Sequence, residues 1–293
     1  MILLKAVLSA VSFTYFINKT NDHAEKISSG FGVLYAFCGY FVAYSWNIMW
    51  LDAMAVFPFV MLGIERIINE RKPLMFIVSL TYTMITNYYM AYMVCILSVI
   101  YFLYYYFCRY ELTAEIRVRD RVGVQTSFAG SDPGEQNEIK PRKKQSAFAV
   151  LKNNRFFASG FMFACYAVLS FFLAAFALLP VVFTLRSSSA TSSSFPDTLK
   201  VYFNFFDFAA NHLPAVNTTI RSSGDVVLPN VYCGILSVLM LPFFFMSSKV
   251  SGKQKIAAAV VIGVFYLSFS LNYLNYIWHG SVYFPIAFLV DNS

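Results

Sequence analysis

The chain has 293 residues, of which 58% are hydrophobic, 19% aromatic and only 13% charged. Soluble domains contain roughly 25% charged residues, so this composition excludes an ordinary soluble protein. Several apolar runs reach or approach the ~20 residues that cross a bilayer as a helix, and they lack the alternation of barrel strands. We therefore predict an all-α polytopic membrane protein.

The net charge of +7 could suggest a nucleic-acid or other anionic partner. In a polytopic protein, however, excess Lys and Arg usually lie in cytoplasmic loops. We therefore expect the lipid bilayer, and no nucleic acid, as the partner. The five cysteines are scattered and form no CxxC pair, so the sequence suggests no zinc site and no disulfide framework, and we assign no metal ligand.

The apolar runs lie at about 2–17, 30–46, 49–68, 73–107, 156–185, 229–247 and 256–277. As one straight helix, run 73–107 would be about 52 Å long, well beyond a ~30 Å hydrocarbon core. Asn87 tolerates turns, and the tyrosines that follow it favour the membrane interface. We therefore predict a helical hairpin that turns there, and about eight transmembrane helices in all.

Basic residues orient these runs. The loop 108–155 contains ten Lys or Arg against six acids, whereas the loop 186–228 contains three of each. The positive-inside rule therefore predicts that the first loop is cytoplasmic and the second extracytoplasmic. The segments 66–72 and 249–255 are also basic and predicted to be inside, so run 73–107 starts and ends in the cytoplasm and must cross twice.

The predicted organisation follows from this orientation. It consists of N-terminal membrane helices with five spans (1–107, with 73–107 as the hairpin), a basic cytoplasmic loop (108–155), a long transmembrane helix (156–185), an extracytoplasmic loop (186–228) and C-terminal membrane helices (229–293).

A short polar and aromatic island, Trp46 to Asp52, places a carboxylate beside a membrane span. Burying an ionisable group in hydrocarbon costs about 2.5 to 3.5 kcal/mol, so such a group is a functional-site hypothesis. With this orientation the island, the turn at Asn87 and the segment Trp278-His279 all face outward. The candidate substrate-binding residues are Trp46, Asn47, Trp50, Asp52, Asn87, Tyr88, Tyr89 and His279.

These features also have structural alternatives. In the functional interpretation, Asp52 lines a polar cavity together with Trp46, Asn47 and Trp50, which surround it. In the structural interpretation, Asp52 complements the positive end of a helix dipole. The segment at Asn87 could likewise be only a turn with interfacial tyrosines. Four small residues on one helical stripe predict a helix-packing face: Gly32, Ala36, Gly39 and Ala43.

Longer motifs resemble the YfhO family of bacterial membrane proteins. The segment from Tyr35 to Ile67, YAFCGYFVAYSWNIMWLDAMAVFPFVMLGIERI, carries the core SWNIMWLD followed by GIERI. The motifs TNYYMAYM at 86–93, LPNVYCG at 228–234 and WHG at 278–280 then come in that family's order. The resemblance extends over nearly the whole chain, with gaps in the two large loops.

This family is similar to the multispanning C-superfamily glycosyltransferases, so the resemblance implies part of a GT-C-type fold in a bacterial plasma membrane. It implies an enzyme that uses a polyprenyl-phosphate-linked sugar to decorate a cell-wall polymer, such as lipoteichoic acid, on the outer face. Such chemistry needs a basic or metal-assisted clamp for the phosphate and a carboxylate to activate the acceptor hydroxyl. The implied partners are the lipid-linked donor and the polymer acceptor, with a divalent cation as a possible cofactor.

The chain departs from the family pattern at both ends. Members begin with one more span and a large outer loop holding the acidic catalytic motif, whereas MILLKAVLSAVSFTYFI resembles the following span, and WHGSVYFPIAFLVDNS stops where members continue. We therefore expect a fragment that is inactive alone, and we assign no catalytic residue. Two other functions stay open: a transporter or flippase for a lipid-linked precursor, and a non-catalytic membrane scaffold.

Overall fold

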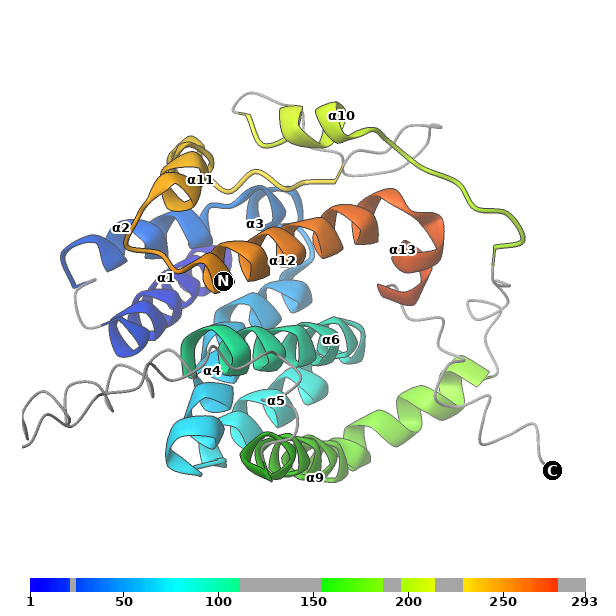
Figure 1. Cartoon of the computed structure of the whole chain (residues 1–293). Coiled ribbons are helices and arrows are strands. Elements are labelled where there is room, and N and C mark those ends of the chain that lie inside the picture. The colour runs from blue at the N-terminus through cyan, green and yellow to red at the C-terminus, as the bar shows by residue number, and fades with distance from the viewer. Residues whose placement is uncertain (22–24, 111–153, 187–195, 214–228, 279–293) are drawn as a thin grey trace, which may run out of the picture.

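The computed structural model describes residues 1–21, 25–110, 154–186, 196–213 and 229–278 (Figure 1). Within these ranges the chain is helical apart from short connections and one isolated antiparallel bridge between Val201 and Leu271. A helix satisfies its own backbone N–H and C=O groups, so apolar runs of this length fold as helices in lipid. Most of the predicted cytoplasmic loop 108–155 and parts of the predicted outer loop 186–228 lie outside the described residues.

The helices follow one another as α1 (Ile2–Thr20), α2 (Glu25–Ala36), α3 (Gly39–Ala43), α4 (Ile48–Glu70), α5 (Leu74–Thr86), α6 (Tyr88–Tyr105), the π-helix η1 (Tyr106–Tyr110), α9 (Asn154–Arg186), α10 (Phe205–Ala210), α11 (Ile235–Met246), α12 (Gly252–Ser270) and α13 (Asn272–Trp278).

Six segments of the described chain are long and apolar enough to cross a membrane, and they correspond to six of the eight predicted spans. They are α1, α2 with α3, α4, α6 with the start of η1, α9 and α12. The other two predicted spans form the shorter apolar helices α5 and α11. At 1.5 Å per residue these two are only about 20 Å long. The prediction of an all-α polytopic membrane protein is confirmed.

Helix α4 lies at the centre of the described structure. It packs against α1, α5, α6 and α9. Of its most apolar 18-residue stretch, 56% is buried, a larger share than in the other spanning helices described. Figure 1 shows α1 and α2 on one side of α4, and α5 and α9 on the other. The fully buried side chains Val60, Ile64 and Ile67 of α4 form the main core with Phe76 and Leu80 of α5. The second half of α4 is therefore positioned by its packing against α5.

The helices α4 and α5 cross most closely at Gly63. A Cβ atom added to Gly63 would lie 2.6 Å from the Cα and backbone N of Phe76. Since backbone atoms on both helices define this contact, no side-chain rotation can relieve a clash there. Small residues at such crossings allow the close helix packing that stabilises membrane bundles.

We expect Gly63→Ala to destabilise the protein by about 1 to 3 kcal/mol, because an inserted methyl group must push α5 away from α4. Unfolding by SDS in mixed micelles, followed by circular dichroism, measures this change. Gly263→Ala on α12 is the matched control, because a Cβ there meets no atom within 4 Å. Equal stability of the two variants would contradict the close crossing.

The predicted run 30–46 forms two helices instead of one. Helix α2 ends at Ala36 and α3 begins at Gly39, whose N–H donates a 2.6 Å hydrogen bond to the carbonyl of Tyr232. The break therefore ties this span to a segment far away in the sequence. All four residues of the small-residue stripe are buried, and Gly32 lies directly against Ala10 and Thr14 of α1.

The chain reverses direction at Asn87, between α5 and α6. Asn87 has an extended backbone (φ −160°, ψ 106°), and its side-chain oxygen accepts a 3.0 Å hydrogen bond from the N–H of Met90, so it caps α6. The ring of Phe163 on α9 lies 5.2 Å from that of Phe76, near the start of α5, and 5.0 Å from that of Phe102, near the end of α6. The start of α5 and the end of α6 therefore lie close together, which leaves Asn87 at the opposite end of the helix pair.

Candidate functional site

An ion pair joins the first turns of α1 to the beginning of α4. The Nζ atom of Lys5 lies 2.7 Å from Oδ1 of Asp52, and the two side chains are only 11% and 23% exposed. Lys5 also donates a 2.9 Å hydrogen bond to the backbone carbonyl of Ile48. This arrangement places an ammonium group and a carboxylate side by side at one end of the helix bundle, which we call the Asp52 end.

Local packing explains why these two groups meet. Ala6 and Leu51, the sequence neighbours of Lys5 and Asp52, are buried with Phe41 in one small apolar cluster. Asp52 lies in the second turn of α4, beyond its N-cap residue Asn47. Its carboxylate bonds the ammonium of another helix, so the pair with Lys5, and not the helix dipole alone, defines the environment of Asp52.

Four aromatic rings gather at the same end, and we call them the Trp50 cluster: Tyr40, Tyr44, Trp50 and Tyr89. The ring of Trp50 lies 5.1 Å from that of Tyr44, 5.7 Å from that of Tyr89 and 6.5 Å from that of Tyr40, to which it is nearly parallel. These separations are within the range of favourable ring contacts. The cluster links α4 to α6 and to the segment around α3.

The predicted site residues fall into two groups on α4. Trp50 and Asp52 are two positions apart, and residues with this spacing do not share a helix face. Trp50 accordingly contacts the segment around α3 and the start of α6, while Asp52 contacts α1. The structure thus places the carboxylate and the Trp50 cluster on different faces of one helix end, instead of in a single ring.

The remaining predicted residues differ in their surroundings. Trp46 is 61% exposed and Tyr88 is 41% exposed, so both lie on the surface of the described chain. Asn47 and Asn87 are the N-cap residues of α4 and α6. His279 lies outside the described residues.

Lys5, Tyr40 and Tyr44 were not among the residues predicted from sequence. Lys5 had a detectable signal, because it is the single charged residue in the apolar run 2–17. An ionisable residue inside a spanning segment indicates function or a buried partner. Tyr40 and Tyr44 had no such signal in the sequence, because their contact with Trp50 depends on how the segment around α3 folds back beside α4.

A second polar cluster lies about 20 Å farther along α4, thirteen residues from Asp52. The buried carboxylate of Glu65 accepts a 2.6 Å hydrogen bond from the hydroxyl of Tyr101 on α6. The hydroxyl of Thr20, at the end of α1, lies 3.1 and 3.2 Å from its two oxygens. This cluster cross-links three helices and has the character of a structural network.

The described residues contain no group of three or more His, Cys, Asp or Glu side chains that could hold a metal ion. At the Asp52 end, the ammonium of Lys5 already supplies a positive charge beside the carboxylate. The residues described there therefore do not fit a divalent cation site, and we derive no step through one.

Taken together, the six spanning segments, the central helix and the partly buried ion pair define a multi-pass membrane protein built from helices. Its sequence matches the family model described as "Bacterial membrane protein YfhO" over residues 1–290. The chain belongs to the YfhO family, and the resemblance predicted from its motifs is confirmed.

One curated relative comes from Bacillus subtilis (strain 168) and is described as "Uncharacterized protein YfhO". It is 42% identical to the chain over 66 residues, which are 22% of this chain and 8% of the relative. The aligned stretch thus spans a small part of the relative's length. No solved structure gives a significant match.

Proposed function

We propose that this chain contributes to a membrane glycosyltransferase that uses a polyprenyl-phosphate-linked sugar to decorate a lipoteichoic-acid-like polymer on the outer face of the plasma membrane. The single observation that carries the proposal is the Lys5–Asp52 ion pair at one end of the bundle. Family membership is the second support, since the fold alone does not specify an activity.

The chemistry of glycosyl transfer makes demands that this pair can meet. The bond between the sugar C1 and the phosphate oxygen breaks, a bond from C1 to the acceptor oxygen forms, and the acceptor proton passes to a base. A nearby ammonium stabilises the departing phosphate, and a carboxylate accepts a hydrogen bond from a sugar or acceptor hydroxyl. We assign Lys5 to the phosphate and Asp52 to a hydroxyl, and we assign the base to none of the described residues.

The Trp50 cluster supports the same proposal from the other face of α4. Aromatic rings offer flat apolar surfaces that pack against the C–H face of a sugar or an isoprenoid chain, and Tyr hydroxyls add hydrogen-bonding groups at the rim. The exposed ring of Trp46 extends this surface at the same end of the helix. In this proposal the cluster orients the lipid-linked donor, and Lys5 and Asp52 contact its polar groups.

The proposal is tested in a full-length YfhO-family protein that carries the equivalent residues, expressed in a host strain that lacks it, by measuring sugar on lipoteichoic acid with mass spectrometry. We expect Asp52→Asn and Lys5→Gln each to lower sugar transfer by about 10- to 150-fold, which corresponds to one lost charge-assisted hydrogen bond of 1.5 to 3 kcal/mol. Lys253→Gln, which changes an exposed lysine at the start of α12, is the matched control. Membrane levels of each variant are measured in parallel.

Other outcomes would assign another function. Normal transfer by Asp52→Asn at a normal membrane level would show that this carboxylate has no role in the site. Movement of a lipid-linked precursor across vesicle membranes without sugar transfer would favour a flippase. Function that survives loss of Lys5, Asp52 and Trp50 together would favour a membrane scaffold.

A further inference from the structure

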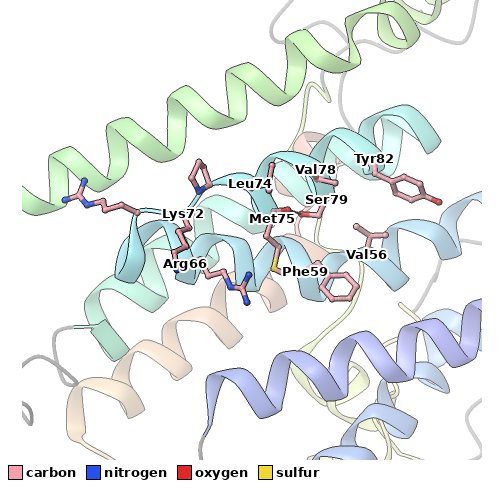
Figure 2. A pocket seen from close by; sticks show the side chains of 11 residues that line it. Val56, Phe59, Arg66, Lys72, Leu74, Met75, Val78, Ser79 and Tyr82 are labelled. Atoms are coloured by element: carbon pink, nitrogen blue, oxygen red, sulfur yellow. Dashed lines mark hydrogen bonds between the residues drawn. The ribbon is translucent and has the colours of Figure 1, made fainter.

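A groove of about 800 Å³ runs between α4 and α5, from Val56 to the basic residues at the end of α4 (Figure 2). This volume is within the ~300 to 1,000 Å³ typical of small-molecule sites. Val56 and Phe59 of α4 form one wall, and Leu74, Val78 and Tyr82 of α5 form the other. Because the three α5 residues are spaced at i, i+4 and i+8, they form a continuous stripe along that helix.

The walls of the groove are exposed on the surface of the described chain. Leu74 is 73% exposed and Val78 is 58% exposed, although both are aliphatic. In a membrane protein, exposed aliphatic side chains of this kind contact the hydrocarbon chains of the lipid. A groove of this shape, flanked by two helices, suits an extended acyl chain.

One end of the groove is basic. Arg66, Arg71 and Lys72 line it there, where α4 ends and α5 begins. Glu70 is the carboxylate beside them, and it pairs with Lys72 at 2.9 Å, with both side chains largely exposed. Among the described residues, three cations against one carboxylate leave an excess of positive charge at the mouth of an apolar groove.

The charges also determine which way a lipid would lie. Arg66 is fourteen residues from Asp52 along α4, a distance of about 21 Å. At the far end of the groove, Val56 lies one helical turn beyond Asp52 on α4. Among the described residues Lys5 stands alone beside Asp52 at that end, whereas Arg66, Arg71 and Lys72 outnumber Glu70 at the other, so the basic end is the better place for an anionic headgroup.

We propose that this groove binds an anionic phospholipid, with its phosphate headgroup against Arg66 and Lys72 and one acyl chain along α5. Clusters of Lys and Arg at the ends of spanning helices attract anionic lipids by about 1 kcal/mol per residue, which is about fivefold in affinity. The apolar stripe adds the burial of methylene groups. This lipid is distinct from the donor proposed above, because its headgroup lies at the opposite end of α4.

Native mass spectrometry of the detergent-purified chain tests the proposal, with phosphatidylglycerol and phosphatidylcholine added at equal concentrations. We expect the chain to retain phosphatidylglycerol preferentially. The double variant Arg66→Gln/Lys72→Gln should lower that preference at least tenfold. Lys253→Gln/Lys255→Gln is the matched control, because it removes two charges at the start of α12 that do not line the groove.

A second variant separates the acyl chain from the headgroup. Val78→Trp fills the groove without changing charge, so we expect it to lower retention of phosphatidylglycerol severalfold, and it decides the question if the double variant does not fold. Unchanged retention in both variants would overturn the proposal, as would an equal loss in the control. Competition by inorganic phosphate would indicate a simple anion site, and displacement by polyprenyl phosphate would assign the groove to the carrier lipid; either result would also overturn it.

Discussion

Asp52→Ala is expected to destabilise the protein by about 3 kcal/mol, because it leaves the ammonium of Lys5, whose side chain is 11% exposed, without its carboxylate. Removing one member of a largely buried ion pair costs far more than the pair itself contributes, since the remaining ammonium has lost most of its water and its carboxylate and retains the Ile48 carbonyl as an acceptor. SDS unfolding in mixed micelles measures the loss.

Two further variants make this prediction specific. The double variant Lys5→Met/Asp52→Leu removes both charges, so it should be more stable than Asp52→Ala, because no unpaired charge remains. Lys72→Ala breaks the largely exposed Lys72–Glu70 pair and should cost at most about 1 kcal/mol. If Asp52→Ala were as mild as Lys72→Ala, the pair would not be buried as described.

Glu65→Ala is expected to cost about 2 to 4 kcal/mol, because it removes the acceptor of the hydroxyl groups of Tyr101 and Thr20. The 2.6 Å bond from Tyr101 has the length of a charge-assisted O–H···O⁻ bond, and Glu65 is 4% exposed. Glu65→Gln keeps an acceptor of similar shape and should cost roughly 1 kcal/mol. The same SDS unfolding assay compares them.

Glu70→Ala provides the matched control for Glu65. It removes a carboxylate from the same helix, five residues farther along, whose side chain is 49% exposed and pairs with Lys72 at the surface. We expect a change of at most about 1 kcal/mol there. A loss for Glu65→Ala no larger than this would show that the network does not hold α1, α4 and α6 together.

The spans could be predicted because their signal is local. Apolar composition and length depend only on the neighbouring residues in the sequence, and lipid requires each span to satisfy its own backbone. The reversal of the chain at Asn87 could be predicted for a similar reason, since run 73–107 is too long for one crossing and Asn is common at helix ends. The break between Ala36 and Gly39 was not, because it depends on the carbonyl of Tyr232, nearly two hundred residues away.

The candidate site was predictable only in part. Asp52 could be selected because a carboxylate beside hydrocarbon requires an explanation. Its partner could not, because the register between α1 and α4 is set by the packing of Ala6 and Leu51. The basic groove could not be predicted from the sequence either. Arg66 and Val78 line the same groove only because α4 and α5 pack closely at Gly63.

The sequence by itself therefore determined the class of this protein, its spans, its family and the carboxylate at the start of α4, because each depends on composition or on residues close together in the chain. The tertiary structure alone decided that Asp52 pairs with Lys5, that Trp50 lies on another face among Tyr40, Tyr44 and Tyr89, and that a basic groove opens at the far end of α4. These pairings depend on helix rotation and crossing, which are set by side-chain packing between distant segments.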